Sequence, residues 1–160
     1  MARATLISAA EERLLAHPVD AAWTVLADVP AYPRWWPEDV GVRVLRAAPG
    51  LVGSELTLDP RRGRAFALRV VDAEAPKRIG LAYEGDWLEG EGQWILRRRG
   101  SGVLVRYEMH VRSDRWLVAL ASKAVDLPAL HSRQMHEVLE GLEAEAQRRA
   151  SPRPAVKARG

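Results

Sequence analysis

The chain has 160 residues, of which 48% are hydrophobic and 28% charged, and it contains no cysteine. This composition is typical of a globular chain of single-domain size, and it excludes disulfides, thiolate catalysis and cysteine-ligated zinc. The net charge is +3 and the isoelectric point is about 9.7. Residues 148–160 hold five basic residues and no acidic ones, and subtracting these five from 24 leaves 19 basic against 21 acidic residues. The rest of the chain is therefore slightly acidic, and we expect no specific nucleic-acid site.

This charge distribution predicts one domain over 1–149 and a basic, disordered tail over 150–160. Weak contact of the tail with RNA, ribosomes or anionic lipid is the alternative. Glu11, Glu12 and Arg13 stand where a secretion signal needs its apolar core, and no apolar run approaches the roughly 20 residues of a membrane span. We therefore expect a soluble, cytoplasmic protein without a transmembrane segment. A weak dimer is left open.

The first elements in the chain are a strand and two short helices. Residues 4–16 are rich in strand-forming residues and end before Pro18, which suits a helix start. Val19, Trp23 and Leu26 then follow the spacing of an amphipathic helix over 18–29. Beyond it, two prolines allow only a single turn or a short helix around Trp35 and Trp36.

A series of strands follows, separated by turn residues about every ten positions, as in an antiparallel meander. The predicted strands are 39–47, 52–59, 64–74, 78–84, 88–98 and 103–112. In the last of these, apolar residues alternate with mostly charged ones, as in a strand with one buried face.

From 114 to 149 the apolar residues recur at steps of three or four, which predicts a long helix that Pro128 kinks or divides from a leading turn. This helix alone is long enough to cover the apolar face of the sheet. The sequence therefore predicts an α+β fold in which a curved antiparallel sheet of about six or seven strands surrounds the C-terminal helix.

Three segments carry a resemblance to a known family. They are PVDAAWTVLADVPAYPRWWPEDV at 18–40, Gly92-Gln93-Trp94, and HSRQMHEVLEGLEAEAQRR at 131–149. With them the chain resembles the START and Bet v 1-like (SRPBCC) superfamily, and within it the bacterial polyketide cyclase/dehydrase-like branch. The resemblance implies a helix-grip fold with a tunnel between sheet and helix for a large apolar ligand such as a lipid, sterol or polyketide. The superfamily also includes hormone receptors, chaperone regulators and ribosome-binding proteins, so the resemblance does not fix the function.

Several aromatic residues are candidates for lining the ligand cavity, because Trp and Tyr combine an apolar ring with a polar edge. The resemblance places Trp35 and Trp36 near the tunnel mouth. The alternation of the strands directs Tyr83 and Trp87, and then Trp94, Tyr107 and Met109, toward the interior. Plain core packing is the alternative for each, and for Trp23 it is the preferred interpretation. For the Trp pair, the alternative is one buried and one exposed ring.

His131 lies on the apolar stripe of the long helix, one turn before Met135. A neutral imidazole there could bind a ligand oxygen or transfer a proton, and Met135 suits an adaptable apolar wall. The alternative is a core histidine bonded to the backbone or to Tyr107. Arg69 is a further candidate if its strand face points inward, and a solvated residue otherwise.

The chain contains neither HExxH nor GxSxG, and its glycines match no phosphate loop. His131 and His136 are about 140° apart on a helix and cannot share a metal ion. We therefore expect no cofactor and no metal site. The leading hypothesis is the binding of an apolar small molecule. The alternatives are a cyclase or dehydratase using His131, Tyr107 and Arg69, and an interaction module using the tail and the Trp35-Trp36 turn.

Overall fold

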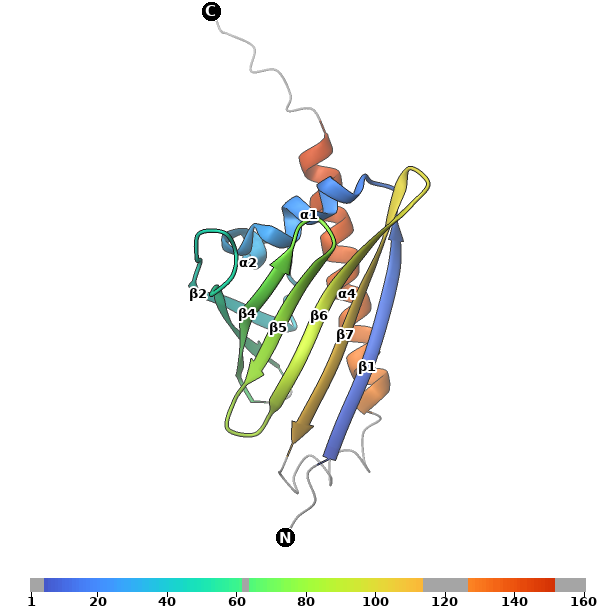
Figure 1. Cartoon of the computed structure of the whole chain (residues 1–160). Coiled ribbons are helices and arrows are strands. Elements are labelled where there is room, and N and C mark those ends of the chain that lie inside the picture. The colour runs from blue at the N-terminus through green and yellow to red at the C-terminus, as the bar shows by residue number, and fades with distance from the viewer. Residues whose placement is uncertain (1–4, 62–63, 114–126, 152–160) are drawn as a thin grey trace, which may run out of the picture.

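Seven antiparallel strands form one continuous, curved sheet in the structure, a computed structural model that describes residues 5–61, 64–113 and 127–151 (Figure 1). The strands are β1 (Thr5–Leu15), β2 (Val40–Arg46), β3 (Glu55–Pro60), β4 (Phe66–Glu74), β5 (Arg78–Glu84), β6 (Glu89–Arg99) and β7 (Gly102–Ser113). Their order is β1-β7-β6-β5-β4-β3-β2, so β2 to β7 form a meander and β1 pairs with the last strand. The predicted meander is confirmed.

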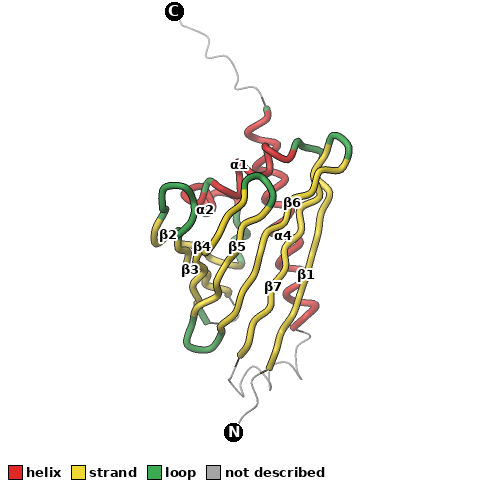
Figure 2. The backbone as a smooth tube through the Cα atoms, viewed as in Figure 1, coloured by secondary structure: helices red, strands yellow, loops and turns green. Residues whose placement is uncertain are grey.

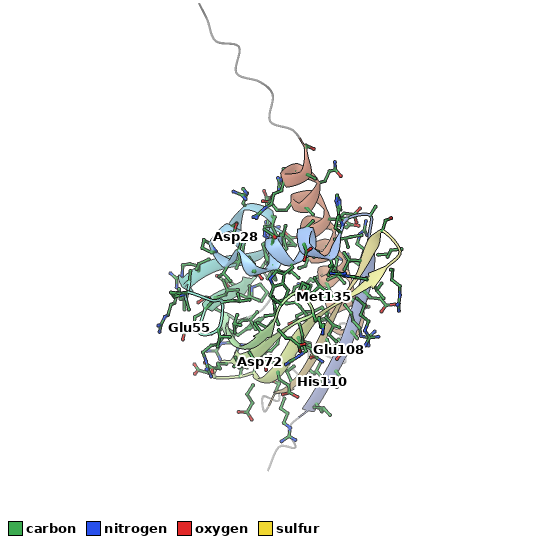
Figure 3. The ribbon with its side chains drawn as sticks, turned by 45° about the horizontal axis from the view of Figure 1, so that its top comes forward. Asp28, Glu55, Asp72, Glu108, His110 and Met135 are labelled. Carbon is green, nitrogen blue, oxygen red and sulfur yellow. The ribbon has the colours of Figure 1, made fainter. Side chains whose placement is uncertain are left out.

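The alternation of β7 determines which side of the sheet becomes the core. Val103, Val105, Tyr107, Met109 and Val111 are buried on what we call the inner face. The residues between them are half-buried or exposed on the outer face. Figure 3 shows two of these, Glu108 and His110, together with Met135 of the C-terminal helix.

The two predicted short helices follow β1. Helix α1 (Val19–Ala27) begins directly after Pro18 and buries Val19, Ala22, Val25 and Leu26, while Trp23 is half-buried against the core. The 3-10 helix η1 (Val29–Ala31) and α2 (Tyr32–Trp35) come next, each with a proline in its first turn. Pro37 follows α2 directly, so the chain turns away into β2. The predicted helix over 18–29 is thus divided at Asp28 between α1 and η1.

The long helix α4 (Leu127–Ala150) packs against the inner side of the sheet and contacts β1, α1 and α2 (Figure 2). Its buried residues Met135, Val138, Leu139, Leu142 and Ala146 join the core of the sheet. Pro128 lies in the first turn, where the missing N–H is tolerated. The predicted helical residues 114–126 and the tail beyond 151 lie outside the described residues. No described helix is both long and apolar enough to cross a membrane.

Candidate functional site

Three aromatic side chains meet on the inner face at the centre of the sheet. Trp94 of β6 and Tyr107 of β7 are direct cross-strand partners, with ring centroids 4.8 Å apart. Gly92 leaves space for Tyr83 and Tyr107, because a Cβ atom there would lie 3.0 Å from the Tyr107 hydroxyl and 2.9 Å from the ring of Tyr83. The strand alternation therefore brings Tyr83, Trp94 and Tyr107 together, as predicted.

The hydroxyls of Tyr83 and Tyr107 lack hydrogen-bond partners among the described residues, although the two side chains are only 5% and 4% exposed. Tyr32, by contrast, is equally buried and donates its hydroxyl to the carbonyl oxygen of Leu26 at 2.6 Å. Burial raises the pKa of Tyr83 well above its ordinary value. The Tyr83 hydroxyl therefore stays protonated, and each of the two hydroxyl groups can donate a hydrogen bond to a bound molecule.

His131 faces the interior from the first turns of α4. Its Nδ1 atom is buried and has no hydrogen-bond partner in the described part of the chain. Burial lowers the pKa of His131 below its ordinary value, and this effect outweighs the opposing charge of Glu11. The imidazole is therefore neutral at pH 7. The alternative of a core histidine bonded to Tyr107 or to the backbone therefore has no support from Nδ1.

Glu11 is an inner-face residue that the sequence analysis did not select. It lies directly opposite Tyr107 in the pairing of β1 with β7. It accepts a hydrogen bond from the Ser132 hydroxyl, and its carboxylate oxygen lies 3.2 Å from Nε2 of His136. The signal was the alternation of β1, which places Glu11 and Arg13 on the same face as Ile7, Ala9 and Leu15. The first strand therefore brings a carboxylate near His131.

The predicted apolar walls of the site are buried as expected. Met109 of β7 and Met135 of α4 are both buried in the core cluster. Contact of Met109 and Met135 with a ligand stays a prediction, and the same is true of the aromatic residues.

Trp35 and Trp36 stand at the end of α2 and differ in burial. Trp35 is buried between Tyr32 and α4, and Trp36 is half-buried, with its ring stacked on Tyr32 at 5.7 Å. The Nε1 atoms of both indoles are buried without a partner among the described residues. The Trp pair therefore adds two unused hydrogen-bond donors to those of the tyrosines.

Trp87 follows the end of β5 and is not part of the strand itself. Its Nε1 donates to the carbonyl oxygen of Ala65 at 3.3 Å, and its ring meets Phe66 edge-on at 6.1 Å. Phe66 in turn stacks on Tyr83 at 5.7 Å. Trp87 is thus half-buried at the margin of the aromatic cluster.

Arg69 belongs to the outer face and is not near the inner aromatic residues. It lies between buried Leu68 and Val70 in β4, and its guanidinium pairs with Glu84 at 2.7 Å with 43% of the side chain exposed. The hypothesis that Arg69 points inward and acts in catalysis is therefore wrong. The alternative, a solvated Arg69, is confirmed.

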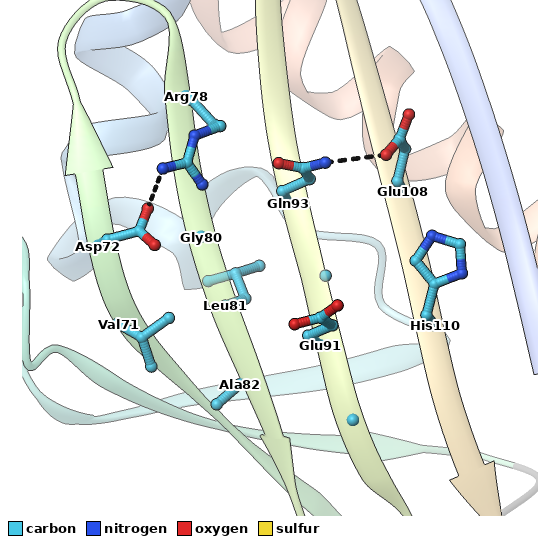
Figure 4. A pocket seen from close by; sticks show the side chains of 12 residues that line it. Val71, Asp72, Arg78, Gly80, Leu81, Ala82, Glu91, Gln93, Glu108 and His110 are labelled. Carbon is cyan, nitrogen blue, oxygen red and sulfur yellow. Dashed lines mark hydrogen bonds and ion pairs between the residues drawn. The ribbon is translucent and has the colours of Figure 1, made fainter.

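A shallow groove of about 290 Å³ also lies on the outer face (Figure 4). The groove exists because Gly80 and Ala82, which form its floor, have small side chains or none, while Asp72 and Gln93 lie on its two sides. Its polar groups are largely satisfied, since Arg78 pairs with Asp72 at 2.8 Å and Gln93 donates to Glu108 at 2.9 Å. This groove is separated from the predicted site by the sheet. The described residues contain no group of three or more potential ligands for a metal ion.

Comparison with protein-family models identifies one match, which covers residues 15–131. The matching family is described as polyketide cyclase / dehydrase and lipid transport. The chain belongs to this family. The resemblance noted from the three sequence segments is thereby confirmed. No curated protein matches the sequence.

Several solved structures have the same fold as this member of the polyketide cyclase / dehydrase and lipid transport family. A START superfamily protein from Mycobacterium smegmatis has 17% identity and a TM-score of 0.69, covering 89% of this chain and 99% of its own. TTHA0849 from Thermus thermophilus has 19% identity and a TM-score of 0.72, covering 91% and 100%. Norcoclaurine synthase from Thalictrum flavum, in complex with dopamine and hydroxybenzaldehyde, has 11% identity and a TM-score of 0.68, covering 93% and 91%. At these identities the likeness shows the fold alone.

Proposed function

We propose that this protein binds an apolar small molecule, bearing at least one polar group, between the inner face of the sheet and α4. One observation carries the proposal: Nδ1 of His131 is buried without a partner among the described residues, and the Tyr83 and Tyr107 hydroxyls form no hydrogen bond to a described residue. A buried polar group without a hydrogen bond costs about 1–3 kcal/mol. A ligand that supplies the missing partners recovers part of this cost on binding.

The chemistry of these atoms restricts the ligand. The tyrosine hydroxyls donate, and the indole nitrogens of Trp35 and Trp36 can only donate. A carbonyl, hydroxyl or phenol oxygen on the ligand satisfies such donors, whereas a pure hydrocarbon does not. The family description, which covers polyketide cyclisation and lipid transport, supports ligands that combine an apolar body with oxygen atoms.

The experiment is native mass spectrometry on freshly purified protein, followed by organic extraction of the bound material. A discrete additional mass is the expected result, and the extract identifies the chemical class. With this ligand, we expect Tyr107→Phe and His131→Leu each to weaken affinity about tenfold, since each removes one hydrogen bond. Arg69→Gln on the outer face is the control and should leave the affinity unchanged. Equal affinity in all four proteins contradicts the proposal.

A second candidate function, cyclisation or dehydration of a polyketide-like substrate, is favoured by the position of Glu11. A neutral His131 can remove a proton from carbon next to a carbonyl, and the nearby Glu11 carboxylate stabilises the imidazolium that forms. The Tyr107 hydroxyl, opposite Glu11, can stabilise the resulting enolate oxygen.

The test of this chemistry is turnover of the extracted ligand or of a poly-β-ketone probe. We expect His131→Ala to abolish turnover while the melting temperature changes little, and Glu11→Gln to lower the rate. Turnover that survives in His131→Ala removes His131 from the mechanism and leaves the binding function.

A further inference from the structure

Three consecutive arginines, Arg97, Arg98 and Arg99, end β6 at the turn into β7. All three are exposed, and none forms an ion pair with a described residue. Eight other arginines form ion pairs with acidic residues, namely Arg13, Arg34, Arg61, Arg69, Arg78, Arg106, Arg148 and Arg149. Further exposed arginines without an ion pair to a described residue are Arg43, Arg46, Arg64, Arg112 and Arg133, and only Arg97, Arg98 and Arg99 are consecutive in the sequence. The β6–β7 hairpin, residues 97–104, therefore carries an uncompensated positive charge.

Apolar side chains lie directly beside these cations. The strand register places Leu104 between Arg97 on one side and Leu14 of β1 on the other, all on the outer face. Leu14 lies on the edge strand β1 and is 61% exposed. The row thus presents a cation, a half-buried leucine and an exposed leucine to the solvent.

The hairpin and the C-terminal end of α4 lie at the same end of the molecule (Figure 1). The helix ends at Ala150, and the sequence beyond it contains Arg153, Lys157 and Arg159 without any acidic residue. The end of the molecule that bears the hairpin is therefore also the end at which α4 terminates.

We propose that the β6–β7 hairpin, with Leu14, docks this protein on an anionic lipid bilayer. Arginine guanidinium groups bind phosphate oxygens in a two-pronged geometry, and clustered basic residues are attracted to anionic lipid. The exposed Leu14 enters the boundary between headgroups and acyl chains, where an apolar side chain leaves water. A single-stranded RNA would satisfy the arginines equally, but it offers nothing to the leucine row, because it recognises proteins through phosphates and stacked bases. The leucines therefore favour the bilayer as the partner.

Docking at this site does not depend on the ligand proposed for the inner face. Arg97, Arg99 and Leu14 lie on the outer face, and Arg98, opposite Val103, is exposed on the other side at the end of the hairpin. None of them contributes to the inner aromatic cluster. The two proposals can therefore fail separately.

The experiment is flotation of the full chain with vesicles of phosphatidylcholine alone or of phosphatidylcholine with phosphatidylglycerol. We expect binding to the anionic vesicles only, decreasing as salt is raised. The triple variant Arg97→Gln/Arg98→Gln/Arg99→Gln should lose about a hundredfold in affinity, on the basis of roughly one fivefold step for each arginine at an anionic surface. Leu14→Gln should lose severalfold with no change in charge.

The matched control is Arg43→Gln/Arg46→Gln/Arg64→Gln, which removes the same charge from exposed positions in and near the strands at the other side of the sheet. It should retain nearly all vesicle binding, and melting temperatures should agree among all variants because the changed side chains are exposed. Equal loss in both triple variants shows attraction by net charge alone and overturns the proposal. Absence of vesicle binding, with arginine-dependent binding of a labelled single-stranded RNA, also overturns it and makes nucleic acid the partner.

Discussion

Gly141 of α4 lies so close to the carbonyl oxygen of Trp35 that no Cβ atom fits between them. A side chain at this position would also lie 3.5 Å from Cε3 of the Trp35 ring. The contact brings α2 directly onto the long helix, so Trp35 and Trp36 are held beside α4 by a missing side chain.

Gly141→Ala is therefore expected to destabilise the protein although alanine is the better helix former. The displacement of α2 should cost about 3 kcal/mol, which exceeds the gain in helix propensity of about 1 kcal/mol, so we expect a net loss of about 2 kcal/mol. Chemical denaturation measures the difference. Ala144→Gly, at an exposed position of the same helix, is the control and should cost about 1 kcal/mol. A stabilised Gly141→Ala variant would show that α2 moves away freely.

Glu145 is a buried carboxylate whose loss should be costly. It is only 1% exposed and accepts hydrogen bonds from Arg34, Arg148 and Arg149. Glu145→Gln removes the negative charge that these arginines surround, and we expect a loss of roughly 3 kcal/mol in the free energy of unfolding. Glu84→Gln, which breaks the exposed pair with Arg69, should cost less than about 1 kcal/mol. Similar costs for the two variants would contradict this account.

The same residue predicts how stability responds to acid. Burial raises the pKa of Glu145, but the hydrogen bonds from Arg34, Arg149 and Arg148 outweigh it and hold the pKa below its ordinary value of 4.5. The stabilisation is therefore fully present above pH 4.5 and is lost as the pH falls toward the lowered folded-state pKa. Denaturation at a series of acidic pH values should show this slope in the wild type and a weaker one in Glu145→Gln.

The unpartnered tyrosines should tolerate loss of their hydroxyls. Tyr83→Phe and Tyr107→Phe remove no hydrogen bond to a described residue, so the unfolding free energy without ligand should be unchanged or slightly higher. Tyr32→Phe removes the bond to Leu26 and should cost about 1 kcal/mol. Thermal denaturation of the three variants tests the contrast, and a large cost for Tyr83→Phe would show that its hydroxyl has a partner in solution.

His131 gives a second pH dependence, at a higher pH than that of Glu145. Burial lowers its folded-state pKa below the ordinary 6.5, so the unfolded chain binds a proton first as the pH falls. The contribution to stability is intact above pH 6.5 and is lost between 6.5 and the lowered pKa. The difference in unfolding free energy between wild type and His131→Leu should change in this range. A difference that is constant with pH would mean that His131 is not protected from protonation.

Much of the fold was predictable because its strands have one apolar and one polar face. The alternation in β7 and the turn residues between strands indicated the meander, and Pro33 and Pro37 limited α2 to one turn. The inward positions of Trp94, Tyr107 and Met109 followed from the same alternation. Local periodicity is enough for these features, because it reports directly which face of an element is buried.

The polar residues of the site could not be predicted as well from the sequence. Glu11 was missed because a carboxylate in a strand normally marks the solvent face, and here its partners Ser132 and His136 are more than 100 residues away. The face of Arg69 could not be decided before its buried neighbours were known. Pairing between the first strand and the last helix is a long-range property that no local pattern encodes.

The position of β1 has a consequence for how the chain acquires its structure during synthesis. Within this domain β1 is synthesised before the other strands, yet its neighbours in the sheet and in the core are β7 and α4, which are synthesised after the rest of the sheet. The emerging N-terminal segment, with the exposed Leu6 and Leu14, therefore has no native partner until most of the chain has left the ribosome. Folding should be dominated by this late closure and be slow for a protein of this size. The still unpaired β1 segment carries charged side chains at Glu11, Glu12 and Arg13, and these charges discourage its pairing with other nascent chains.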